Sequence, residues 1–480
     1  MFALMLVAAL TAQTNAPALT PQEASRDLAI ARAALERLHP GYDRYAPRGE
    51  LDAAWAGLEA GAQDGADLAE LYLGLSGLLA DIRCDHTKAE LPEAVAEWRE
   101  TAPVYLPFQF VLFEGGMYVE TPAPGTGLQR GEEILSLDGD PVSERLAQAR
   151  RFMPVDGFTD HVRDVALQQS SEFLGSGFDQ FDPLLNPDDG EVALEVRGLD
   201  GSVRTVRADR VGFVDYRALS GAARWRNFSD EGAVSVTRPR PGVAILNVET
   251  FVNYRTPVDP YAVFGAIFSQ LAEERVETLI VDLRRNGGGS VDAQLALLAH
   301  LTREATVRAG AETILTSYDF TGLREYIRTW DRSALDPDPE LLTPREDGRF
   351  TLADGVNSLD QDVARAEAAF SGDIILLTSR ANSSGATQMI GALRDQGHVT
   401  LIGEATGGSQ EGPTAGLVWF VELPESGVIV RVPWWLQIST VDEPEFGRGY
   451  DPDIAAPLTY GAWLAGRDPA MSAALAAAAD

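Results

Sequence analysis

A strand–turn–helix pattern at residues 373–397 constrains the fold most strongly. The continuous apolar run Ile374–Leu377 is typical of a strand that is buried on both faces of a parallel sheet. Small and polar residues follow at Ser379–Gly385, and apolar residues then recur at helical spacing until Gly397 ends the helix. Ser384 is therefore predicted to lie where a buried strand leads into the N-terminus of a helix.

This position suits a nucleophile. A helix N-terminus offers unpaired backbone N–H groups and the positive end of the helix dipole, which stabilise the oxyanion formed when a serine attacks a carbonyl. The alternative is that Ser383 or Ser384 only caps the helix, which is the commoner role of such a serine. The turn alone does not decide between the two roles.

Strands and helices alternate from residue 236 onward, which predicts an α/β core. Val243–Val248 and Leu279–Leu283 are predicted strands, and Tyr261–Glu274 and Asp360–Phe370 are predicted helices.

The glycines at 287–289 lie between a predicted strand and the helix that begins at Val291. They lack both the Lys-Ser/Thr of a P-loop and the spacing of a dinucleotide fingerprint, so phosphate binding is weakly supported. Close approach of the backbone to a substrate carbonyl is the better use of three glycines.

The N-terminal region, 17–103, is predicted to be a helical domain. A helix start signal at Thr20–Glu23 and an apolar periodicity over Asp67–Leu79 carry this prediction. His86 follows in a polar loop beside Asp85, which makes it a candidate general base, although a lone histidine is more often structural.

Residues 104–210 change to a β pattern. Phe108–Phe113 and Met117–Glu120 are predicted strands, and the sequence GLQRGEEILSLDGDPV at 127–142 resembles the strand–turn–strand segment of PDZ domains. Residues 150–188 look like a helical insertion. The loop that would hold a peptide carboxylate contains Pro107 and lacks the usual glycine, so peptide capture is doubtful and a scaffold or lid is an equal alternative.

Composition excludes several functions. The net charge of −33 makes nucleic acid and anionic membranes improbable partners. The single cysteine, Cys84, excludes an internal disulfide, and Lys88 is the only lysine. No histidine pairs at a zinc-ligand spacing with the cysteine or with another histidine, so no metal and no cofactor are predicted. The histidines are His39, His86, His161, His300 and His398.

The apolar run at residues 3–12 has the length of a signal-peptide core and is too short to span a membrane. Small residues follow it, so residues 1–16 are predicted to be a signal peptide that is cleaved after Ala12 or Ala16. A periplasmic or secreted location is expected.

Four segments in register resemble the carboxyl-terminal processing and tricorn-core serine peptidases, a tail-specific protease-like family. They are VDLRRNGGG at 281–289, SSGATQMIGALRDQG at 383–397, IGEATGG at 402–408 and GYDPDI at 449–454. The resemblance implies an α/β core with a crotonase-like spiral at 236–460, followed by a C-terminal helix at 461–480. It also implies an endopeptidase that cleaves peptides or unfolded proteins through a serine acyl-enzyme.

The same resemblance places the nucleophile on Ser384, with Ser383 as the alternative register. The family's glutamate three positions later is replaced by Thr387. The backbone N–H groups of Gly385 and Gly288 fall on the oxyanion-hole positions.

The same resemblance also indicates which residue is the general base. Where one branch has a lysine, this chain has Ser409, so the resemblance favours the histidine-base branch, with His86-Thr87 on its HT motif. Asp85, Glu443 and Glu445 are the candidate acids. A histidine suits this role because imidazole accepts protons near neutral pH and an acid fixes its tautomer. The alternative function is a non-catalytic ligand- or peptide-binding protein on the same fold.

Overall fold

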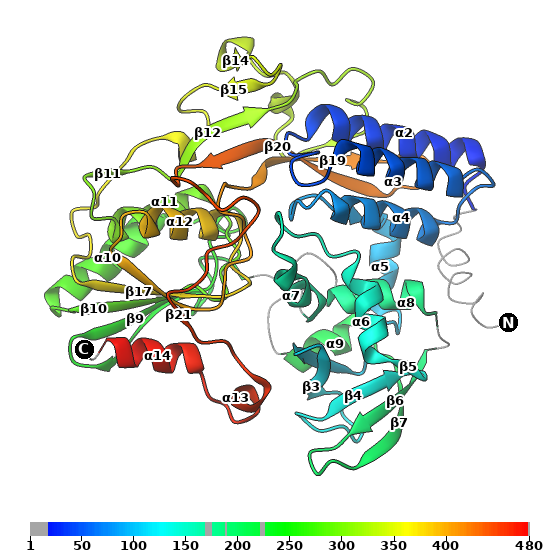
Figure 1. The fold of residues 1–480 in the computed structure, drawn as a ribbon, viewed down its shortest axis with the longest axis horizontal. Coiled ribbons are helices and arrows are strands. Elements are labelled where there is room, and N and C mark those ends of the chain that lie inside the picture. Colours follow the sequence, from blue (N-terminus) through cyan, green and yellow to red (C-terminus); the bar gives the residue numbers. More distant parts are fainter. Residues whose placement is uncertain (1–17, 169–174, 188–189, 221–225, 479–480) are drawn as a thin grey trace.

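The computed structural model describes residues 18–168, 175–187, 190–220 and 226–478 (Figure 1). The predicted signal peptide lies outside the described residues. The fold is a mixed α/β fold, as the sequence predicted. Within the described residues, no helix is long and apolar enough to cross a membrane.

A six-stranded sheet forms the centre of the C-terminal half, with strand order β21-β18-β17-β10-β9-β8. All neighbours pair in parallel except β8 and β9. The strands are β8 (Val234–Arg240), β9 (Val243–Val248), β10 (Thr278–Asp282), β17 (Asp373–Thr378), β18 (Val399–Gly403) and β21 (Ile454–Ala455).

Both faces of this sheet are covered, which explains its continuous apolar strands. Leu279 and Val281 of β10 pack in one cluster with α10 (Pro260–Glu273), α11 (Val291–Leu301) and α12 (Ser384–Arg394). Ile280 packs in another cluster with α14 (Pro469–Ala477). Successive side chains of a strand point to opposite faces, so one strand supplies both layers.

An antiparallel sheet that the sequence did not predict joins the N-terminal region to the C-terminal half of the chain. Its strands are β1 (Ala89–Glu90), β12 (Gly310–Leu315), β13 (Ile327–Arg328), β14 (Leu342–Pro344), β15 (Phe350–Leu352), β19 (Thr414–Glu422) and β20 (Ile429–Ser439). In Figure 1 the N-terminal helices α2 (Pro21–Leu38), α3 (Arg48–Gly61) and α4 (Leu68–Asp81) lie beside β19 and β20, and their apolar side chains share one core with these strands.

The third region is a β sheet with strand order β2-β3-β4-β6-β7 and with β5 (Asp140–Pro141) paired to β4. Its strands are β2 (Phe108–Phe113), β3 (Gly116–Pro122), β4 (Glu133–Leu137), β6 (Glu191–Arg197) and β7 (Val203–Asp209). The accompanying helices are α5 (Glu93–Thr101), α6 (Val142–Arg150), α7 (Arg163–Gln168), α8 (Gly177–Leu185) and α9 (Phe213–Ser220). The strands predicted at Phe108–Phe113 and Met117–Glu120 both form.

The edge of this sheet is occupied by the chain itself. β2 is an edge strand, and Leu112 N–H donates to Oε1 of Gln168 in α7 over 2.6 Å. Asp164 of α7 pairs with Arg150 of α6 at 2.6 Å, which fixes α7 between that helix and the strand. A peptide adding to β2 as a further strand would need the N–H that Gln168 already satisfies.

The predicted helix at Asp360–Phe370 is wrong. A 3₁₀ turn occupies Ser358–Asp360, and β16 (Val363–Ala364) pairs with β11 (Thr306–Val307). The backbone N–H of Phe370 donates to the carbonyl of His300 instead of closing a helical turn. Helix propensity is a weak preference, and pairing with distant backbone overrides it here.

Candidate active site

The turn between β17 and α12 holds the candidate nucleophile in a strained backbone conformation. Ser384 has φ 48°, in the left-handed region that serine rarely adopts. Asn382 fixes the turn because its buried side chain donates to the carbonyls of Leu283 (2.6 Å) and Asn286 (2.9 Å). Its own carbonyl accepts the N–H groups of residues 407 and 408. The strain is therefore held in place by surrounding hydrogen bonds.

Ser383 occupies the N-cap position of α12, but its side chain makes no capping hydrogen bond. Its Oγ instead donates to Oδ2 of Asp85 over 2.7 Å. The simple capping role is therefore wrong for Ser383. The bond joins the serine turn to the Asp-His-Thr loop, 298 residues away in sequence.

Gly288 lies against Ser384, the candidate nucleophile. A Cβ on Gly288 would stand 3.0 Å from both Ser384 Cβ and Gly385 N, and φ is +101°, so a larger residue would strain the turn. However, the Gly288 N–H donates to Oδ1 of Asn286 over 2.9 Å. The prediction that this N–H serves the oxyanion hole does not fit this conformation, in which a side chain already accepts it.

The loop that carries His86 is braced by a second histidine. Nδ1 of His39 accepts the N–H of Gly41 at 3.1 Å, so Nε2 carries the proton and donates to Oγ1 of Thr87 at 2.7 Å. Complete burial lowers the pKa of His39 to about 3, which keeps the ring neutral. Thr87 of the HT motif therefore anchors the loop.

The sequence prediction missed two buried acids, one of which contacts this loop. Oδ1 of Asp156 accepts the Asp85 N–H at 3.0 Å, and one Asp156 oxygen lies within 4.8 Å of a His86 ring nitrogen. Burial, with Asp85 nearby, raises the pKa of Asp156 to about 8. The second acid is buried Glu411, whose Oε1 accepts the Tyr45 hydroxyl at 2.6 Å. No local pattern in the sequence marks either residue.

The sequence profile of peptidase family S41 matches residues 242–455. These residues belong to peptidase family S41. The chain is therefore a serine-type peptidase, as predicted, and the strained serine turn and the glycine run both lie inside the matched region.

Two solved structures share the fold over most of the chain. Mature CPAF complexed with lactacystin overlays with a TM-score of 0.63 at 17% identity, covering 92% of this chain and 95% of that one. Mature CPAF gives a TM-score of 0.62 at 17% identity, covering 92% and 94%. A photosystem II D1 C-terminal processing protease gives 0.42 at 18% identity, covering 91% and 93%. No curated protein sequence matches the chain.

Two of the predicted acids do not have the expected surroundings. The side chains of Glu443 and Glu445 are exposed, and Glu445 pairs with Arg448 at 3.5 Å. Exposure does not fit the prediction that one of them fixes the tautomer of the base. Their loop nevertheless reaches the site, because Gly447 N–H donates to Oε1 of buried Glu411 at 2.8 Å.

The start of the helical insertion also contacts the S41 domain. Nε2 of His161 lies 3.1 Å from the carbonyl oxygen of Thr406, and Val162 lies close enough to Gly407 to exclude a side chain there. The N–H of Phe158 donates to the carbonyl of Gly447 at 2.6 Å. Residues 156–162 therefore brace the loops around the serine turn.

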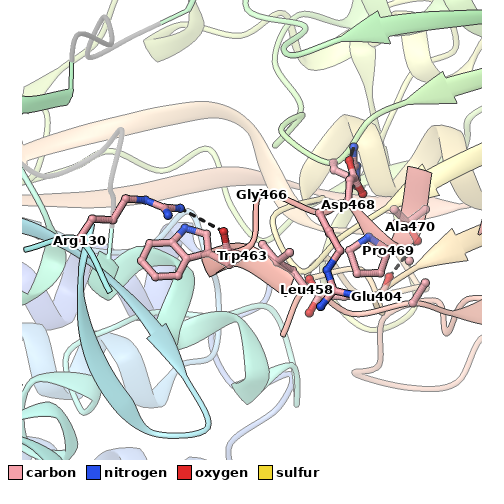
Figure 2. A pocket seen from close by; sticks show the side chains of 13 residues that line it. Arg130, Glu404, Leu458, Trp463, Gly466, Asp468, Pro469 and Ala470 are labelled. Carbon is pink, nitrogen blue, oxygen red and sulfur yellow. Dashed lines mark hydrogen bonds and ion pairs between the residues drawn. The ribbon is translucent and has the colours of Figure 1, made fainter. Parts of the chain in front are cut away.

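A cavity of about 300 Å³ is lined by residues of the parallel sheet and of the start of α14, and neither Ser383 nor Ser384 is among its lining residues (Figure 2). Two of its three arginines, Arg130 and Arg284, are engaged within the protein. Arg130 lies 4.0 Å above the ring of Trp463 and donates to its carbonyl, and Arg284 pairs with Asp468 at 2.8 Å. We assign no catalytic group to this cavity.

Proposed function

We propose that this S41 peptidase is an exported endopeptidase in which Ser384 is the nucleophile and His86 the general base. The observation that carries the proposal is the left-handed backbone of Ser384 at the strand–helix junction, pressed against Gly288. The hydrogen bond from Ser383 to Asp85 then brings the loop of His86 to the same junction. Ser383 is occupied by that bond, so Ser384 is the better nucleophile of the two.

The chemistry follows from these positions. The imidazole of His86 takes the Oγ proton as Ser384 attacks the scissile carbonyl, and returns it to the leaving amine as the acyl-enzyme forms. The N–H of Gly385, in the first turn of α12, and the positive end of that helix stabilise the oxyanion. A water molecule then attacks the acyl-enzyme ester. His86 takes the proton of this water and returns it to the Ser384 Oγ as the acid product leaves. Asp156 supports this reaction as a positioning residue, because it holds the Asp85 N–H beside the base.

The substrate class is a peptide or an unfolded protein. We interpret residues 236–460 as a crotonase-like spiral core and residues 104–210 as a PDZ-like domain with an inserted helical segment. Because α7 covers the β2 edge, the PDZ-like domain acts as a scaffold or lid in this conformation and not as an open peptide site.

A fluorophosphonate probe tests the nucleophile. The purified wild type should be labelled, Ser384→Ala should not, and Ser383→Ala should retain labelling. Circular dichroism of each variant checks that the fold is intact. Labelling that survives in Ser384→Ala but is lost in Ser383→Ala would contradict the assigned register. A folded wild type that is never labelled would favour a non-catalytic binding protein.

Export has its own test. Intact-mass measurement of the chain from the native envelope fraction should give a mature protein that starts after Ala12 or Ala16. A full-length chain in the cytoplasm would contradict export and leave the nucleophile assignment untouched.

A further inference from the structure

The folded chain brings together three metal-binding side chains that sequence spacing alone does not reveal. Cys84 and His86 lie on the loop after α4, and Asp156 comes from the start of the insertion. The Cys84 Sγ, one ring nitrogen of His86 and one carboxylate oxygen of Asp156 all lie within 4.8 Å of one another. Thiolate, imidazole and carboxylate are the donors by which proteins bind Zn²⁺.

The burial and hydrogen bonding of Asp156 independently indicate a bound ligand. The residue is 3% exposed, and its Oδ2 accepts no hydrogen bond from the described residues, whereas Oδ1 accepts the N–H of Asp85. A buried carboxylate oxygen without a partner costs free energy, which a bound cation would recover.

The other two donors are suited to the same ion. Cys84 is buried, and its thiol donates to the carbonyl of Thr414 over 3.4 Å, a weak bond to lose. His86 is partly exposed, so an ion reaches the cluster from the side of the base. A tetrahedral ion held by three protein ligands keeps its fourth position for water.

We propose that Cys84, His86 and Asp156 form a Zn²⁺ site that reversibly inhibits the peptidase. Binding releases the Cys84 thiol proton and any proton on Asp156 to solvent, and directs a His86 nitrogen lone pair to the metal. A metal-bound imidazole cannot accept the proton of Ser384. The inhibition rests on the proposed role of His86, whereas binding itself does not.

Co²⁺ allows metal binding to be detected spectroscopically in a variant that has no peptidase turnover. Full-length Ser384→Ala protein, treated with chelator and titrated with Co²⁺, should develop a thiolate-to-cobalt charge-transfer band. Adding Cys84→Ser should abolish the band, while the serine hydroxyl can still donate to the carbonyl of Thr414. Adding Asp156→Asn should weaken Co²⁺ binding, and this substitution introduces no new charge. His161→Gln, a matched loss of another imidazole near the site, should leave the band unchanged. Absence of the band in folded Ser384→Ala protein would overturn the site.

Zinc titration of peptidase activity tests the consequence. Wild type should lose activity with added Zn²⁺ and recover it with chelator. Cys84→Ser should raise the inhibitory Zn²⁺ concentration by at least about tenfold, the lower end of what loss of even a supporting group costs a metal site. A wild type that gives the cobalt band yet stays active with Zn²⁺ bound would overturn the inhibition and with it the role of His86 as base. Inhibition that is equal in Cys84→Ser and wild type would overturn the site alone.

Discussion

The two halves of the candidate active site are built in different ways. The serine turn is a short connection between β17 and α12, and its hydrogen bonds run mainly to the turns that follow the two neighbouring strands, at 283–286 and 407–408. The base loop is held from four directions, by His39, Asp156, Ser383 and the helix α4 before it. The nucleophile is therefore fixed within one α/β layer. The position of the proposed base, His86, depends on how three regions of the chain pack together: the N-terminal region, the segment that carries Asp156 and the serine turn.

Removing the nucleophile should have the largest effect. Ser384→Ala should lower kcat by roughly 10⁶-fold, the scale for loss of a serine nucleophile. Ser383→Ala loses one hydrogen bond to Asp85, worth about 1.5–3 kcal/mol, so its loss should stay below roughly 200-fold. Steady-state kinetics on a quenched peptide measure both. A larger loss in Ser383→Ala would place the nucleophile one residue earlier.

Substitution of His86, at the centre of the base loop, should lower activity nearly as much. His86→Ala should lose about as much kcat as Ser384→Ala, because members of a catalytic unit are strongly non-additive. Lys88→Met, which keeps the aliphatic stem, should lose little. In wild type, kcat/KM should fall as acid protonates His86, because an imidazolium cannot accept the Ser384 proton. Turnover that needs Lys88 and survives in His86→Ala would show that the base is wrongly assigned.

The anchor of the serine turn should show an intermediate effect. Asn382→Ala leaves the carbonyls of Leu283 and Asn286 without their donor, and should cost about 1–3 kcal/mol of unfolding free energy for each group left buried and unpaired. Because the strain at Ser384 then relaxes, kcat should fall more than KM rises. Urea unfolding and kinetics on the same preparation separate the two. Unchanged kcat in Asn382→Ala would show that the turn is fixed from elsewhere.

The anchor of the base loop should appear in the pH dependence of stability. The pKa of His39 is lowered to about 3 by burial, below the ~6.5 of an unfolded histidine. Below pH ~6.5 the unfolded chain therefore binds a proton at this histidine, whereas the native chain does not. The free energy of unfolding falls as a result, by about 1.4 kcal/mol per pH unit from this group. His39→Gln should be less stable at pH 7 but lose less on going to pH 5. Thermal denaturation at both pH values measures this, and parallel losses in the two proteins would contradict it.

The smallest effect should come from the sheet edge. Gln168→Ala leaves the Leu112 N–H without its side-chain acceptor, at a cost of about 1 kcal/mol in unfolding free energy. Gln168→Glu keeps an acceptor and serves as the control. Hydrogen exchange at Leu112 should accelerate in the alanine variant alone. Equal protection in all three proteins would show that α7 does not seal the edge.

The sequence by itself determined the local parts of this protein. The strand–turn–helix around Ser384, the capping box of α2 and the alternating core follow from residues within a few positions of one another, where hydrogen-bond geometry and periodicity act directly. The failed helix at 360–370 marks the limit of such reasoning, since backbone partners around residues 300–307 decided that segment.

Only the tertiary structure decided the surroundings of the base. Asp156 lies 71 residues from the backbone N–H that it accepts, and Glu411 lies 366 residues from the tyrosine hydroxyl that donates to it. The exposed carboxylates of Glu443 and Glu445 were the better candidates by position in the chain. A carboxylate acquires its role from burial and from the groups that docking brings beside it, and neither quantity is encoded in its immediate neighbours.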